Sequence, residues 1–230
     1  MDRNSNVYTF IYASGMVILV AAILSLAAIN LKPFQDKNIE IEKKQNILAS
    51  VNIATDATNA EEVYAEKIVN SYIVNSKGEQ VEGNAFTVDL KKERSKPVDQ
   101  QLLPVFECKV EDGLKYILPL RGTGLWGPIW GYLSLDSDMS TIYGASFDHQ
   151  GETPGLGAEI ATPIFQSQFK GKEIYDNGKL VSITVAKSNE TAPAEHKVDA
   201  ISGGTITSKG LQKMLLDDLS SYNAFFKQKK

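Results

Sequence analysis

Hydroxyl side chains and two glycines gather near the C-terminus, where residues 198–210 read VDAISGGTITSKG. Glycine carries no side chain, so another molecule can come close to the hydroxyl of Thr205. An apolar, helix-like run follows, and backbone N–H groups at a helix start favour a phosphate. The pattern therefore allows two interpretations: a glycine turn in which Ser208 caps the helix, or a threonine that carries a phosphoester.

A second glycine-rich stretch, GTGLWG, covers residues 122–127. It fits the spacing GxGxxG, but that dinucleotide fingerprint must open a helix directly after a strand. Here Pro128 and a strand-like segment follow, so a Rossmann site is rejected. Two interpretations remain. The corner packs Trp126 and Trp130 into the core, or it brings an aromatic or aliphatic side chain against a flat ligand.

The third stretch, HQGETPGLGAEIATP, covers residues 149–163 and is dense in turn-forming residues. Its length and glycine content favour a loop that binds a small molecule over a simple hairpin. His149 and Glu152 are residue types that bind metals, but their spacing matches no standard site, and the only other histidine is His196. No metal site is predicted, and the chain offers no convincing catalytic triad.

The longest uncharged run lies near the N-terminus, between Arg3 and Lys32. As a helix, the 25 residues from Val7 to Leu31 would be about 37 Å long, against roughly 30 Å of membrane hydrocarbon. A cleaved signal peptide is the alternative, but its apolar region has only ~7–15 residues. We expect a retained single-span anchor. Charge alone does not fix its orientation. More lysines follow the span than basic groups precede it, which favours a cytoplasmic domain, but large domains can be translocated regardless of this charge.

The rest of the chain reads as helices and strands of ordinary length. We expect helices over residues 37–53 and 59–69, a strand and turn over 71–81, an exposed loop over 83–96 and a hairpin over 105–120. Further strands are expected over 129–136, 141–149 and 179–187. The last helix is expected to begin near Ser208, with one apolar face made of Leu211, Met214, Leu215, Leu219 and Tyr222. The predicted class is α+β, with an antiparallel sheet behind one membrane helix.

Composition excludes some functions. The 230 residues carry 24 basic and 28 acidic side chains without a basic stripe, so nucleic acid is not an expected partner. The single cysteine, Cys108, allows no internal disulfide. It alternates with charged residues in VFECKV, which places it on the buried face of a strand with a packing role.

GTGLWG, HQGETPGLGA and DAISGGTITS, in this order behind one membrane span, resemble the C subunit of the bacterial Na+-translocating NADH:quinone oxidoreductase. KQNIL, residues 44–48, also resembles the helix that follows the membrane span in that family. There, FMN is joined through its phosphate to the last threonine of an S-G-A-T sequence. The matching residue here is Thr205, and Gly204 stands where the family usually has alanine.

The resemblance implies an electron carrier that takes electrons from an iron–sulfur centre in neighbouring membrane subunits and passes them to a flavin on the B subunit. It has no catalytic residue and no complete active site of its own, but it is part of an NADH:ubiquinone reductase (Na+-transporting). The implied cofactor is covalent FMN on Thr205, with Thr207 as the less favoured attachment site. The implied cofactor contacts are Leu125, Trp126, Glu152, Thr153, Leu156, Gly157, Ser202, Gly203, Gly204 and Thr207.

The resemblance also implies partners and a location. Asp199, Ser202, Gly203 and Thr205 match the motif that a separate Mg2+-dependent flavin transferase recognises when it uses FAD. The other partners are the B, D and E subunits and membrane lipid. The domain is expected on the periplasmic side of the bacterial inner membrane, with boundaries at residues 1–6 for the N-terminal tail, 7–31 for the span, 32–55 for a post-membrane helix and linker, and 56–230 for the FMN-binding domain.

Two alternatives stay open. One is the G subunit of an Rnf-type electron transport complex, which carries the same kind of attached flavin, although the KQNIL helix and the chain length argue against it. The other is a membrane-anchored binding domain without redox function.

Overall fold

The computed structural model describes residues 6–187 and 189–230 and divides the chain after Lys43 into two compact units. Helix α1 (Asn6–Ser50) forms the described part of the first unit and continues into the second. Of the helices in the described ranges, α1 is long and apolar enough to cross a membrane, with a mean hydropathy of 2.3 in its most apolar window. The helix does not end at Pro33, so the predicted post-membrane helix is the continuation of the same element.

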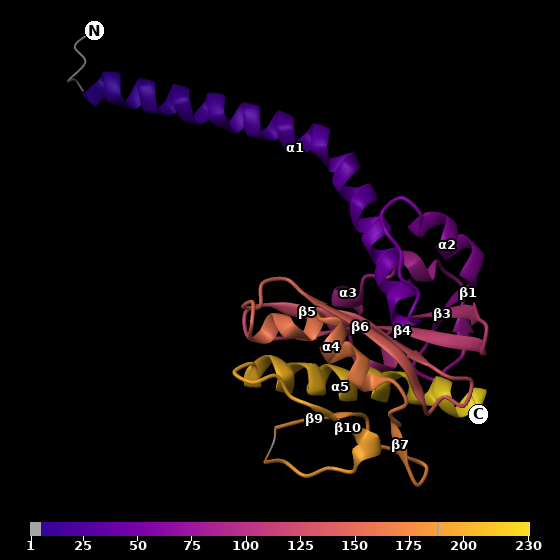
Figure 1. The fold of residues 1–230 in the computed structure, drawn as a ribbon. Helices are drawn as coiled ribbons and strands as arrows, with labels where there is room; N and C mark the ends of the chain where they lie inside the picture. The colour runs from indigo at the N-terminus through magenta and orange to yellow at the C-terminus, as the bar shows by residue number, and fades with distance from the viewer. Residues whose placement is uncertain (1–5, 188) are drawn as a thin grey trace. The chain divides into compact units, whose positions relative to one another are not determined.

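The second unit is built on one antiparallel sheet of six strands, in the order β2-β1-β3-β4-β5-β6 (Figure 1). This confirms the predicted α+β class with an antiparallel sheet. The strands are β1 (Ile68–Val74), β2 (Gln80–Val81), β3 (Leu103–Val110), β4 (Gly113–Thr123), β5 (Pro128–Leu135) and β6 (Ile142–His149). The predicted hairpin is β3 and β4, joined at Glu111 and Asp112.

Further helices and two short strand pairs complete the unit. They are α2 (Ala60–Lys67), α3 (Leu90–Arg94), α4 (Pro163–Gln166), the pair β7 (Tyr175–Asp176) and β8 (Lys179–Leu180), the pair β9 (Thr184–Ala186) and β10 (Lys197–Asp199), and α5 (Thr205–Lys229). Strands β9 and β10 run parallel. Because Ala186 pairs with Asp199 at the end of these strands, the segments that follow the two residues begin side by side, although they are distant in sequence.

Both faces of the sheet are covered. Helix α5 lies along one face (Figure 1), where the predicted apolar side chains are all buried: Leu211, Met214, Leu215, Leu219 and Tyr222. The end of α1 covers the other face, where Ile47 packs with Phe106 and Cys108. Cys108 is fully buried, as predicted, and burial raises the pKa of its thiol to about 11. The thiol therefore stays protonated and unreactive at neutral pH.

Three predicted boundaries are wrong for local reasons. The segment expected as a loop over 83–96 contains a 3-10 turn and α3, and Asp89 caps α3 by accepting a hydrogen bond from the Lys91 N–H at 2.9 Å. The helix expected to reach residue 69 ends at Lys67, because Ile68 already pairs with Cys108 of β3. The strand expected over 179–187 is broken at Ser182, whose φ is +62°.

The start of the last helix is a fourth correction. Helix α5 begins at Thr205, three residues before the predicted cap. Ser208 lies inside the helix, where its buried hydroxyl accepts a hydrogen bond from the Ile201 N–H at 3.2 Å. The serine thus ties the turn before the helix to the helix itself, and Thr205 becomes the first helical residue.

A buried ion pair holds α5 against the sheet. The carboxylate of Asp218, only 1% exposed, pairs with the Arg94 guanidinium of α3 and also accepts the Arg121 N–H of β4 at 2.8 Å. Arg94 is mostly buried as well, and its pKa is lowered by burial. Because β4 leads directly into residues 122–127, this pair fixes the helix relative to the strand that carries the glycine-rich corner.

Candidate functional site

The turn between β10 and α5 places Thr205 at the start of a 25-residue helix. Gly203 of this turn has φ +73°, in the left-handed region that favours glycine, and a Cβ there would lie 2.6 Å from Cδ2 of Leu156. The protein's own Leu156 fills the space beside this glycine. Backbone conformation and packing therefore already require a glycine at position 203, whether or not another molecule approaches Thr205.

The two candidate threonines differ in accessibility. Thr205 is partly exposed, and its hydroxyl makes no hydrogen bond to any residue that the structure describes. Thr207 is 1% exposed, and its hydroxyl donates to Oε2 of Glu152 at 2.5 Å. Of these two threonines, Thr205 is therefore the one whose hydroxyl is both accessible and without a hydrogen bond to a described residue.

A pocket of about 340 Å³ beside Thr205 joins all three glycine-rich stretches. It is lined by Leu125, Trp126, Glu152, Thr153, Leu156, Gly157, Gly203, Gly204, Thr205, Ile206 and Thr207. Every predicted cofactor contact except Ser202 is in this set. Ile206, which is 58% exposed in the structure, was missed in the sequence, although its place next to Thr205 could have indicated it.

The aromatic side of this pocket is exposed. Trp126 is 68% exposed and Leu125 is 47% exposed, so Trp126 does not belong to the core. The core interpretation of the GTGLWG corner is therefore wrong for Trp126, while Trp130 lies partly buried in β5. An exposed indole and two exposed leucines, Leu125 and Leu156, form an apolar rim suited to a flat aromatic ligand.

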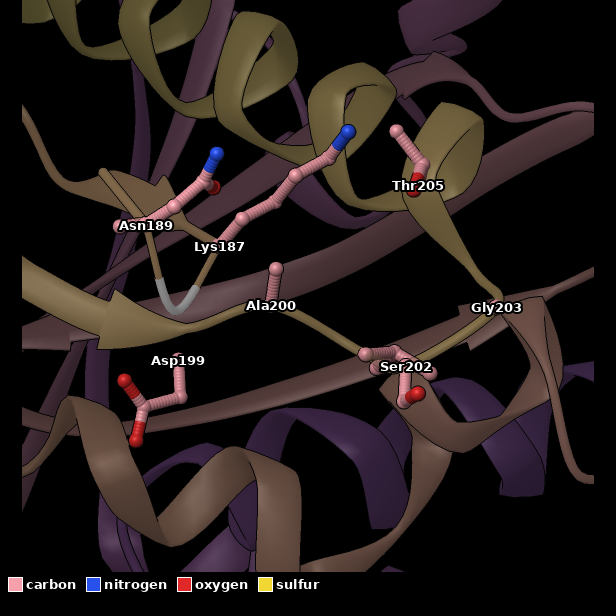
Figure 2. A pocket seen from close by; sticks show the side chains of 9 residues that line it. Lys187, Asn189, Asp199, Ala200, Ser202, Gly203 and Thr205 are labelled. Atoms are coloured by element: carbon pink, nitrogen blue, oxygen red, sulfur yellow. The ribbon is translucent and has the colours of Figure 1, made fainter.

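A second pocket, of about 500 Å³, also reaches Thr205. Figure 2 shows Lys187 extending from the end of β9 toward the first turn of α5, while Asp199 and Ser202 line the turn from β10. Glu190 holds this loop to the helix, since its Oε2 accepts both the Lys187 N–H at 3.1 Å and Lys209 Nζ at 2.8 Å. Lys187 and Asn189 were missed in the sequence, because the parallel pairing of β9 with β10 brings them to Thr205.

The start of α5 and Lys187 make this region suitable for an anion. Gly204 at the N-cap has no side chain, and no side-chain cap bonds to the first turn. The first backbone N–H groups of a helix lack partners within the helix, and they attract negative charge. Lys187 and Thr205 line the same pocket at this helix start.

His149 and Glu152 are used within the protein. Nδ1 of His149 accepts the Glu152 N–H at 3.1 Å, and the Glu152 carboxylate accepts the Trp126 N–H at 2.8 Å. Among residues 6–187 and 189–230, no group of three His, Cys, Asp or Glu side chains is placed to hold a metal ion.

Comparison with known proteins gives one consistent result. Residues 124–220 match the model of the FMN-binding domain family. The C subunit of the Na+-translocating NADH-quinone reductase of Vibrio vulnificus is 32% identical over 215 residues, which cover 86% of this chain and 84% of that protein. Its counterpart in Haemophilus ducreyi is 35% identical over 217 residues, covering 85% and 84%.

A solved structure agrees with these relatives. The crystal structure of the C subunit of the Na+-translocating NADH-quinone reductase from Parabacteroides distasonis is 48% identical and superimposes with a TM-score of 0.81. The match covers 85% of this chain and 96% of that one. From the identity and coverage of these matches, the chain belongs to the family of C subunits of the Na+-translocating NADH-quinone reductase.

Proposed function

We propose that this chain carries electrons in a Na+-translocating NADH-quinone reductase by means of FMN joined through its phosphate to Thr205. The observation that carries the proposal is the accessible, uncommitted Thr205 hydroxyl at a pocket where all three glycine-rich stretches meet. The matches to the FMN-binding domain family and to C subunits support the cofactor and the complex. They also favour this family over the G subunit of an Rnf-type complex.

The residues present fit FMN. The α5 N-terminus and Lys187 suit the phosphate, while Leu125, Trp126 and Leu156 suit an apolar ring system. When bound, FMN supplies reversible acceptance and release of electrons. The protein holds the phosphate by a covalent bond, orients the ring and shields part of it from water. No side chain is required to move a proton in this role.

We propose that a separate flavin transferase makes the attachment, since no described side chain is hydrogen-bonded to the Thr205 hydroxyl to act as its base. In the proposed step the Thr205 oxygen bonds to the FMN phosphorus of FAD, AMP leaves, and the hydroxyl proton is released. Asp199, Ser202 and Gly203 are all exposed, so a flavin transferase can reach the whole motif. We propose that these residues are recognised during maturation.

The experiment that tests the function is purification of the membrane complex by a tag on this chain. Flavin that remains on the polypeptide after denaturation, together with co-purifying B, D and E subunits, supports the proposal. A colourless chain made beside an active transferase, or a chain that purifies alone, contradicts it.

The exposed indole gives a separate prediction. Replacing Trp126 with alanine is expected to change the absorption spectrum and midpoint potential of the flavin while the attached mass and the folding stability stay close to wild type. The reason is that the 68% exposed side chain contributes little to the core but forms one wall of the pocket. Trp126→Phe keeps a flat apolar face and serves as the control. An unfolded Trp126→Ala chain, or one with an unaltered flavin spectrum, would show that the indole does not wall the ring.

We also propose that α1 is a single membrane span in the bacterial inner membrane and that the domain lies on the periplasmic side. Protease added to intact spheroplasts is expected to digest residues 44–230, because they would face the outside. Cleavage is followed with an antibody against the C-terminus. A cytoplasmic protein is the control and must stay intact. Digestion of the domain only after lysis would reverse the proposed topology.

A further inference from the structure

One buried carboxylate connects the three glycine-rich stretches. Glu152 is 4% exposed and belongs to the second stretch. Its Oε1 accepts the Trp126 N–H of the first stretch at 2.8 Å, and its Oε2 accepts the Thr207 hydroxyl of the third at 2.5 Å. We call this hydrogen-bonded group of Trp126, Glu152 and Thr207 the clasp.

Two glycines make room for the clasp. A Cβ on Gly124 would lie 2.5 Å from Oε1 of Glu152, and a Cβ on Gly157 would collide with Oε2 and with the Thr207 hydroxyl. Any side chain at either position would push the carboxylate away from its donors. Gly124 of the first stretch and Gly157 of the second therefore leave the space that the Glu152 carboxylate occupies.

The clasp adds a connection between the walls of the pocket to the backbone hydrogen bonds within each stretch. Leu125, Trp126 and Leu156 are each more than two-fifths exposed, so few neighbours hold their side chains. The clasp fixes the backbone at Trp126 and at Glu152 relative to the first turn of α5, which carries Thr205. Hydrogen bonds to a buried carboxylate are among the stronger ones, because the acceptor is charged and shielded from water.

We infer that Glu152 and Thr207 are positioning residues, which set the apolar rim at a fixed place relative to Thr205 so that an attached flavin is held in one orientation. This inference rests on the proposed function for the identity of the ligand. The clasp itself is a property of the protein and can be tested without flavin.

The test compares Thr207→Val with Thr207→Ser in the full-length chain in detergent, made with and without flavin transferase. Valine keeps the shape of threonine and removes the hydroxyl, whereas serine keeps the hydroxyl. In the flavin-free chains, hydrogen exchange of the amides of residues 124–127 is measured. In the loaded chains, the attached mass, the visible circular dichroism of the flavin and its midpoint potential are measured.

We expect Thr207→Val to speed exchange at Trp126, to keep the attached mass, to weaken the circular dichroism and to shift the potential. Thr207→Ser is expected to restore all of these towards wild type. Glu152→Gln is expected to lie between wild type and Thr207→Val, because its neutral amide can still accept from the Trp126 N–H and donate to the Thr207 oxygen but lacks the charge of the carboxylate. Thr184→Val removes a hydroxyl in β9 outside the clasp and is the matched control. If Thr207→Val does not fold, the smaller variant Thr207→Ala takes its place, and the same changes in exchange, circular dichroism and potential are expected of it.

The inference is overturned if Thr207→Val matches wild type in exchange, dichroism and potential, or if the serine and valine variants behave alike. It is also overturned if Thr184→Val gives the same changes. A wild-type chain without attached FMN contradicts the proposed function instead, and the exchange measurement on the flavin-free chains then still decides whether the clasp exists.

Discussion

Replacing Thr205 with valine is expected to remove all covalently attached FMN and to stop electron transfer through this chain. Valine keeps the β-branched shape, so α5 should still begin here, but the oxygen that forms the phosphoester is gone. Thr205 is only partly buried and its hydroxyl makes no hydrogen bond within the described residues, so folding should change little. Intact-protein mass spectrometry and quinone reductase activity of the complex check the two parts.

Thr207 provides the matched control for Thr205. Thr207→Val should keep the FMN mass, because this hydroxyl is buried and already donates to Glu152. Thr205→Ser retains a hydroxyl that the transferase can use, so it is the less decisive variant. FMN that persists in Thr205→Val and vanishes in Thr207→Val would move the attachment site to Thr207.

Replacing Asp218 with alanine is expected to lower the free energy of unfolding by about 3–5 kcal/mol. The change leaves the mostly buried Arg94 guanidinium without its carboxylate and the Arg121 N–H without its acceptor. Denaturant unfolding of the full-length chain in mild detergent measures the loss.

The neighbouring residue supplies the control. Asp217 pairs on the helix surface with Lys213, where the two side chains are 52% and 75% exposed. Exposed pairs contribute little, so Asp217→Ala should leave the stability close to wild type. Asp218→Asn keeps an acceptor for the Arg121 N–H and should lie between the two. Equal effects of the alanine changes at positions 217 and 218 would show that the buried pair does not hold α5 in place.

Much of the fold could be predicted because its signals are local. The β3–β4 hairpin follows from alternation around a two-residue turn, and the buried face of α5 follows from helical spacing. The start of α5 could not be read in the same way. Ser208 has the type of a capping residue, but its hydroxyl bonds to Ile201 inside the folded turn, and the helix begins at Thr205.

The structure brings most of the predicted site residues together at one pocket, but the sequence did not indicate the hydrogen bonds between them. The glycine-rich stretches identified Leu125, Trp126, Leu156 and Thr205, and the structure gathers them at one pocket. Lys187 escaped prediction, because only the parallel pairing of β9 and β10 brings it to Thr205. The hydrogen bond between Glu152 and Thr207 was not predicted either, because the two residues are 55 positions apart in the chain and meet only in the folded domain.

The most direct test of the central claim is peptide mapping of the wild-type chain produced beside an active flavin transferase. Trypsin cuts after Lys197 and Lys209, so residues 198–209 form one peptide that contains both threonines. We predict that this peptide carries the mass of FMN less one water and that fragmentation places it on Thr205. An unmodified 198–209 peptide, or FMN located on Thr207 or on another peptide, would contradict the account.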